Sequence, residues 1–129
     1  MDNNGKKRIL VVDDDINITE LTQIMLESAG YECQTLNSGK ECVKLLGDKN
    51  SNFDLVLLDV AMPGFSGLDV VKTVREEKIF PLRRIVFFTA SSAPFLEDKE
   101  VVDMGVLDCF KKPFKKLDLL SAVQRYVST

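Results

Sequence analysis

The sequence predicts an α/β protein built on one parallel β-sheet with helices on both faces. Segments with strand character and segments with helical periodicity alternate five times along the chain. The central strand candidates are short apolar runs without polar alternation, such as RILVV at 8–12 and LVLL at 55–58. Such runs are typical of parallel strands that are covered on both faces. Right-handed crossovers would join the successive strands.

The first half of the chain predicts three strands and two helices. Residues 1–7 form a polar tail, and the first buried strand follows at 8–12. A helix is predicted over 17–29, which Gly30 ends. Its residues Leu21, Ile24, Met25 and Ser28 share one face. The next elements are a short outer strand at 31–36, a helix at 38–46 with apolar Cys42, Val43, Leu45 and Leu46, a loop at 47–52 and a buried strand at 54–58.

The second half continues the alternation. A helix is predicted over 68–77, with Leu68, Val70, Val71 and Val74 facing inward. The Pro63-Gly64 pair before it marks a tight turn, and Ser66 is a candidate N-cap. The remaining elements are a loop at 78–82, a strand at 84–88, a turn at 91–94, a helix at 95–104, a strand at 106–110 and a closing helix at 116–127 with Leu117, Leu120, Val123 and Val127 at helical spacing.

Length and composition indicate one globular domain. A chain of 129 residues can bury a proper core, and 45% hydrophobic with 29% charged residues excludes a disordered or fibrous protein. The net charge of −3 argues against a general nucleic-acid surface. Three scattered cysteines without a CxxC spacing, and no histidine, indicate neither a disulfide framework nor a zinc site. We therefore interpret them as the reduced cysteines of a cytoplasmic protein. The N-terminal apolar run is too short for a signal peptide or a membrane span.

Residues able to do chemistry follow four of the predicted strands. Asp13 and Asp14 follow the first strand, Asp59 the third, Thr89 the fourth and Lys112 the fifth. In a sheet of order 2-1-3-4-5 the first and third strands are neighbours, and the chain reverses direction between them. The three carboxylates would therefore converge in the crevice at the carboxyl edge of the sheet.

Three converging carboxylates repel one another unless a cation or protons compensate them. Oxygen ligands without histidine or cysteine favour a hard ion, and Mg²⁺ fits because it binds through few carboxylates together with substrate phosphate. Asp59 can then be the nucleophile that forms an aspartyl phosphate. Lys112 can offset the phosphoryl charge, and the Thr89 hydroxyl can donate a hydrogen bond to a phosphoryl oxygen.

Four motifs, taken together, resemble the receiver domain of two-component response regulators. They are ILVVDDD, DLVLLDVAMPGFSG, IVFFTAS and FKKPF, in the order and spacing of that family. The resemblance covers residues 8–129. It implies a flavodoxin-like (βα)5 three-layer sandwich, of the single-domain chemotaxis-regulator type, with a parallel sheet of order 2-1-3-4-5.

The resemblance also implies roles for individual residues. Asp59 matches the phosphorylated aspartate, and Asp13 and Asp14 match the acidic pair, with Asp14 the direct metal ligand and Asp13 acting through water. Ala61 matches the position whose backbone carbonyl binds Mg²⁺. Thr89 matches the hydroxyl that moves toward the phosphoryl group. Lys112 matches the family lysine.

One position departs from the family pattern. Many members carry Tyr or Phe three residues before this lysine, where the ring moves between exposed and buried positions. Here Cys109 occupies the position, with Phe110 beside it. A thiol is too small to reproduce that movement, so any shift of the fourth helix would depend on Thr89. We expect Cys109 to be a packing residue rather than a redox sensor.

Two further positions bear on the lifetime of the phosphorylated form. Ala61 and Ser91, each two residues past a site residue, flank the expected path of an attacking water. Because Ala61 has no group that could orient water, we expect slow to intermediate self-dephosphorylation.

Other functions also fit parts of the sequence. Asp13 and Asp15 form a DxD pair, as in Mg²⁺-dependent aspartate-nucleophile phosphatases of the haloacid dehalogenase type, but a later acidic motif and a cap are not visible. A flavin-binding protein shares the fold, yet three Asp residues would repel the flavin phosphate. A phosphorylation-independent interaction module is a third alternative.

The resemblance implies a phosphoacceptor rather than an enzyme with separate substrates. It would catalyse only its own phosphorylation and dephosphorylation. The expected phosphodonor is a sensor histidine kinase or a histidine phosphotransfer protein. The output would pass to an unknown downstream protein, with no direct nucleic-acid or membrane contact, or else the chain is a fragment of a larger regulator.

Overall fold

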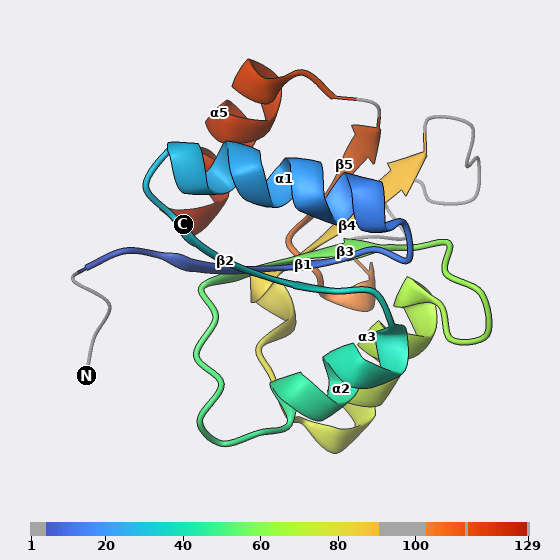
Figure 1. Cartoon of the computed structure of the whole chain (residues 1–129). Helices are drawn as coiled ribbons and strands as arrows, with labels where there is room; N and C mark the ends of the chain where they lie inside the picture. The colour runs from blue at the N-terminus through green and yellow to red at the C-terminus, as the bar shows by residue number, and fades with distance from the viewer. Residues whose placement is uncertain (1–4, 91–102, 113, 129) are drawn as a thin grey trace.

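A computed structural model describes residues 5–90, 103–112 and 114–128, with the side chains of Thr89 and Ala90 excepted. Its elements, labelled as in Figure 1, are β1 (Arg8–Val12), α1 (Ile16–Ser28), β2 (Glu32–Leu36), α2 (Gly39–Leu46), β3 (Leu55–Asp59), α3 (Gly67–Glu77), a 3₁₀ turn η1 (Leu82–Arg84), β4 (Ile85–Ala90), β5 (Asp108–Lys112) and α5 (Lys116–Val127). The helix predicted over 95–104 falls almost wholly outside the described residues.

The sheet has five parallel strands in the order β2-β1-β3-β4-β5. This confirms the predicted fold class and strand order. Figure 1 shows α1 and α5 on one face of the sheet and α2 and α3 on the other. The three layers follow from the parallel connections, because each strand must return through a crossover before the next can pair.

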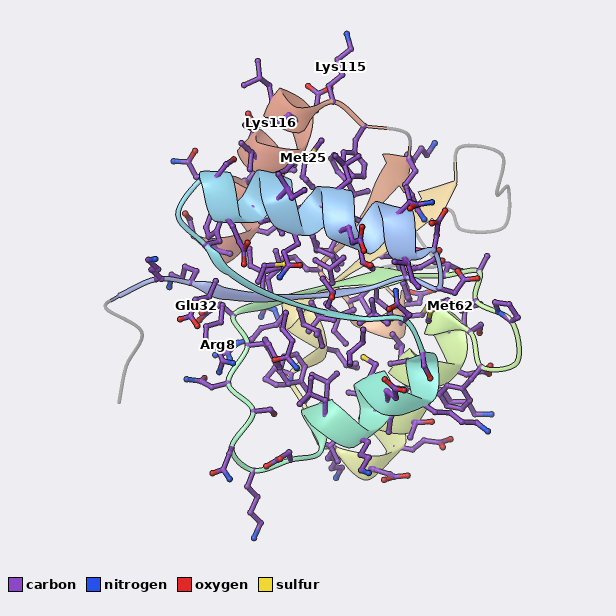
Figure 2. All side chains as sticks on the ribbon, in the orientation of Figure 1. Arg8, Met25, Glu32, Met62, Lys115 and Lys116 are labelled. Atoms are coloured by element: carbon purple, nitrogen blue, oxygen red, sulfur yellow. The ribbon has the colours of Figure 1, made fainter. Side chains whose placement is uncertain are left out.

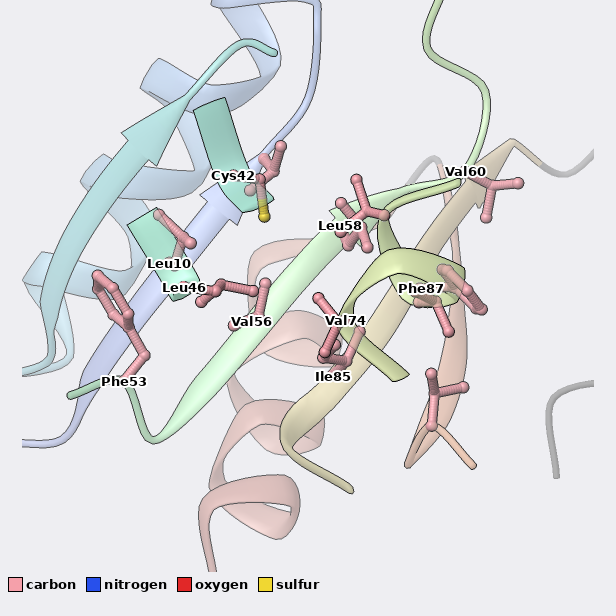
Figure 3. Packing of buried hydrophobic residues seen from close by; sticks show 14 of the residues in the cluster. Leu10, Cys42, Leu46, Phe53, Val56, Leu58, Val60, Val74, Ile85 and Phe87 are labelled. Atoms are coloured by element: carbon pink, nitrogen blue, oxygen red, sulfur yellow. The ribbon is translucent and has the colours of Figure 1, made fainter. Parts of the chain in front are cut away.

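Each central strand contributes to two cores. Alternate side chains of β1, β3 and β4 point to opposite faces, so the apolar runs are buried on both sides. Figure 3 shows the core under α2 and α3, where Leu10, Val56 and Phe87 from the strands meet Leu46 and Val74 from the helices. The core under α1 and α5 contains Ile9, Val11, Leu55, Leu57, Val86, Phe88, Leu119 and Val123. This two-sided burial explains the absence of polar alternation in these strands.

The face of α1 that shares Leu21, Ile24, Met25 and Ser28 is mostly exposed, although Met25 packs in part against the core under α1 and α5. Thr19, Thr22 and Leu26 are buried instead, whereas Leu21 and Ile24 are 47% and 67% exposed. The two threonine hydroxyls donate to carbonyl oxygens of their own helix, Thr19 to Ile16 at 3.0 Å and Thr22 to Ile18 at 2.7 Å. With the hydroxyls satisfied in this way, threonine can face a core.

Two details of the closing segment also differ from prediction. Strand β5 begins two residues later than 106 and ends at Lys112, because it pairs with β4 as far as Ala90. Leu117 of α5 is 77% exposed, and the buried face carries Leu119, Ala122, Val123 and Tyr126. Among the described helices, none is long and apolar enough to span a bilayer.

Candidate functional site

The candidate site lies where β1, β3 and β5 end, at one edge of the sheet. Asp13 follows β1, Asp59 is the last residue of β3, and Lys112 is the last residue of β5. The register places Val12 beside Leu58 in neighbouring strands, so the two acidic segments leave the sheet together. Figure 2 shows Met62, from the loop after β3, at this edge, and Arg8 and Glu32 at the opposite end of the sheet.

Three carboxylates converge at this edge. One oxygen each from Asp13, Asp14 and Asp59 lies within 4.8 Å of the others. Asp13 and Asp59 are buried, at 1% and 5% exposure, whereas Asp14 is exposed. Burial of carboxylates is costly unless they are paired, so the arrangement requires a compensating positive charge.

Lys112 supplies part of that charge. Its Nζ lies 2.6 Å from Asp13 Oδ2 and 3.6 Å from Asp59 Oδ1, and its side chain is only 17% exposed. Among the described residues, Lys112 is the one cation paired with this cluster of three carboxylates, which leaves negative charge uncompensated. The pairing joins residues 99 positions apart in the chain, so it depends on the completed sheet.

The pKa of Asp59 is raised by its burial first and by the surplus negative charge second. Burial of the carboxyl group and, after it, the negative charge of Asp13 raise the pKa of Asp59 from 3.8 to about 7. The Lys112 ammonium and the hydrogen bond from the Ala61 N–H act in the opposite sense. An all-oxygen site with surplus negative charge is the donor set that Mg²⁺ prefers, so the residues present fit this ion.

The loop after β3 is shaped to hold Asp59. The Ala61 N–H donates to Asp59 Oδ1 at 3.3 Å, and the Gly67 N–H donates to the Val60 carbonyl at 2.9 Å. A Cβ at Gly67 would overlap the Asp59 carbonyl and lie 2.9 Å from Val60 Cα, so only glycine allows this close approach. Ser66 is the N-cap of α3, as predicted, and forms a capping box with Asp69.

The structure brings together four of the six predicted site residues: Asp13, Asp14, Asp59 and Lys112. Ala61 lies in the same loop, where its N–H contacts Asp59. The backbone of Thr89 lies in β4 beside Lys111, but its side chain is outside the described part of the chain. Its role therefore stays a prediction, as does that of Ser91.

Cys109 and Phe110 lie on opposite faces of the sheet. Cys109 packs against the core under α2 and α3, as its assignment to packing predicts. Phe110 packs with Phe88 and Phe114 on the other face, with ring centroids 5.8 Å apart in each case. Because Phe110 faces the other side of the sheet, its ring cannot take the place of the aromatic side chain that Cys109 replaces, unless β5 were to exchange its two faces.

One residue of this edge was not singled out from the sequence. Asn37 follows β2, and its Nδ2 donates to the Asp13 carbonyl at 2.8 Å. The same reasoning that identified the other residues, polar side chains directly after parallel strands, would have found it.

The comparisons with known proteins agree on one family. The model of the response regulator receiver domain matches residues 9–124. The chain is 35% identical over 120 residues to the transcriptional regulatory protein CpxR homolog of Haemophilus influenzae, covering 91% of this chain and 48% of that protein. It is 36% identical to the alkaline phosphatase synthesis transcriptional regulatory protein PhoP of Bacillus subtilis, covering 92% and 47%. The chain spans about half the length of these curated relatives.

Solved structures agree with the sequence comparison. The chemotaxis protein CheY4 of Vibrio cholerae superposes with a TM-score of 0.82 at 29% identity, covering 95% of this chain and 99% of that one. The response regulator TrrA of Thermotoga maritima, solved in complex with Mg²⁺-BeF, gives 0.77 at 35% identity, covering 93% and 98%. The chain belongs to the receiver-domain family of two-component response regulators.

Proposed function

We propose that Asp59 accepts a phosphoryl group from a phosphohistidine of a sensor histidine kinase or a histidine phosphotransfer protein. The observation that carries the proposal is the convergence of Asp13, Asp14 and Asp59 within 4.8 Å beside the Lys112 ammonium. A bond forms between an Asp59 carboxylate oxygen and phosphorus while the bond from phosphorus to the donor nitrogen breaks. The leaving imidazole keeps the electron pair and takes up a proton.

Mg²⁺ would be held by the carboxylates of Asp14 and Asp59 and by the Ala61 carbonyl, with Asp13 acting through water, and would neutralise phosphoryl charge. The other roles at the site belong to residues of the chain. Lys112 pairs with Asp13 and lies near Asp59, which supports a role in which its ammonium donates to a phosphoryl oxygen. The Ala61 N–H fixes the orientation of the Asp59 carboxylate. Thr89 would donate to another phosphoryl oxygen.

The position of Asp15 argues against a phosphatase with a DxD motif. In that mechanism the second Asp must reach the leaving group, but Asp15 is the N-cap of α1, and its Oδ1 accepts from the Asn17 N–H at 2.9 Å. Asp13, the first Asp of the pair, is buried against Lys112. We therefore infer a phosphoacceptor that catalyses only its own phosphorylation and dephosphorylation and changes the binding of a downstream protein. Its membership of the receiver-domain family supports the further proposal that it acts in the cytoplasm.

Acetyl phosphate and Mg²⁺ test this function without the cognate kinase. We expect one phosphoryl group per chain in the parent protein, none in Asp59→Asn, and unchanged labelling in Asp48→Asn, which alters an exposed carboxylate. Labelling that persists in Asp59→Asn contradicts the proposal. Steady release of phosphate from several monoesters, with no stable phosphoprotein, favours the phosphatase instead.

A further inference from the structure

The connection between β2 and α2 holds the backbone of Asp13 at both of its polar groups. The Asp13 N–H donates to the Leu36 carbonyl at 3.1 Å, which extends the pairing of β1 with β2 by one bond. The Asp13 carbonyl accepts from Asn37 Nδ2 at 2.8 Å. Because a carbonyl can only accept, the amide of Asn37 must present its nitrogen to this oxygen.

Asn37 also reaches α1. Its Nδ2 lies 3.2 Å from Thr19 Oγ1, and this hydroxyl donates in turn to the Ile16 carbonyl at 3.0 Å. Thr19 is 2% exposed, so its position is fixed by packing. One amide group thus ties the end of β1 to the first turn of α1, across the segment that carries the acidic pair.

This contact bears mainly on Asp14. The Asp13 carbonyl belongs to the peptide that joins Asp13 to Asp14, so its hydrogen bond fixes the plane of that peptide and the direction in which the Asp14 side chain leaves the backbone. Within the part of the chain that the structure describes, the Asp14 carboxylate has no hydrogen bond or ion pair.

The other two carboxylates are held directly. Asp13 accepts from the Asp15 N–H at 3.0 Å and from Lys112 at 2.6 Å, and Asp59 accepts from the Ala61 N–H. The orientation of Asp14 therefore depends on its backbone, and that backbone depends on Asn37.

We propose that Asn37 is a positioning residue for a divalent cation at the acidic cluster, because it presets the direction of Asp14. The inference rests on the proposed function, in which Asp13, Asp14 and Asp59 hold Mg²⁺. Groups that orient metal ligands from outside typically contribute about 10- to 100-fold to metal affinity. Loss of the Asn37 amide should therefore lower the free energy of Mg²⁺ binding by more than it lowers the free energy of unfolding.

Calorimetric titration of the unphosphorylated protein with MgCl₂ measures this directly. Asn37→Ala removes the amide, and Asn37→Leu removes it while keeping most of the volume. Asn52→Ala, at an exposed asparagine before β3, is the matched control. We expect about a tenfold rise in the Mg²⁺ dissociation constant for both Asn37 variants and no change for the control. Circular dichroism at the same temperature verifies that each variant is folded.

A second measurement separates positioning from general damage to the fold. The rate of phosphorylation by acetyl phosphate should return to the parental value in Asn37→Ala at saturating Mg²⁺, because only the metal affinity is impaired. Mg²⁺ affinities within about twofold of the parent in both folded variants overturn the role of Asn37, since an orienting group should contribute more. If the parent protein itself binds no Mg²⁺, the proposed function fails and this inference fails with it.

Discussion

The buried carboxylate of Asp59 should destabilise the metal-free protein at neutral and alkaline pH. Its pKa is raised from 3.8 to about 7 in the folded state, first by burial and then by the charge of Asp13. Between these two values the folded protein binds a proton that the unfolded chain releases, so its free energy of unfolding falls as the pH rises from about 4 to about 7. Above pH 7 the full cost is present.

The shift sets the size of the effect. A pKa difference of about 3 corresponds to about 4 kcal/mol, since a difference of one represents about 1.4 kcal/mol. The side-chain amide introduced by Asp59→Asn would carry no charge and could still accept from the Ala61 N–H. We therefore expect Asp59→Asn to raise the free energy of unfolding at pH 8 by about 2–4 kcal/mol when Mg²⁺ is absent.

Urea denaturation with EDTA present, followed by circular dichroism at pH 8 and at pH 4.5, measures this gain. The gain should be largest at pH 8 and should shrink at pH 4.5, where the parental carboxyl group is largely protonated when folded. Glu76→Gln, which removes an exposed carboxylate from α3, should change stability little at either pH. An Asp59→Asn protein that is equally stable or less stable at pH 8, or whose gain does not depend on pH, refutes the reasoning.

Three further predictions concern single residues at the site. Lys112→Met should lower the free energy of unfolding by about 3 kcal/mol in urea denaturation at pH 8, because it leaves Asp13 and Asp59 without their cation; unchanged stability contradicts this. Gly67→Ala should cost about 2 kcal/mol by the same assay and slow phosphorylation by acetyl phosphate, because its Cβ displaces the Asp59 backbone; a parental rate contradicts it. Ala61→Asn should speed loss of the phosphoryl group, because its amide can orient water, as decay of the isolated phosphoprotein would show; equal or slower decay contradicts it.

The elements that the sequence predicted best are those that burial alone determines. The apolar runs of β1, β3 and β4 had no polar alternation, and each proved to be buried on both faces. The site residues Asp13, Asp59 and Lys112 could be predicted to converge because parallel strands deliver their carboxyl ends to one edge. Their convergence follows from topology and needed no knowledge of side-chain contacts.

The errors arose where an apolar pattern did not settle which face was buried. In α1, Thr19 and Thr22 face the core because their hydroxyls bond to their own helix, an arrangement that hydrophobic periodicity cannot reveal. Asn37 directly follows β2, so its place at this edge could have been predicted in the same way as that of the other site residues. Its bond to a backbone carbonyl 24 residues away could not, because a sequence pattern does not encode such a contact. The role of Thr89 stays a prediction.

Chemical mapping of the phosphorylated residue tests the central claim most directly. The protein is phosphorylated with acetyl phosphate and Mg²⁺, the acyl phosphate is reduced with borohydride, and the peptides are sequenced by mass spectrometry. Reduction converts a phosphorylated aspartate to homoserine. We expect homoserine at position 59, dependent on Mg²⁺, with Asp13 and Asp14 unmodified. Modification at Asp13 or Asp14, or an absence of modification at Asp59 in the folded protein, contradicts the account.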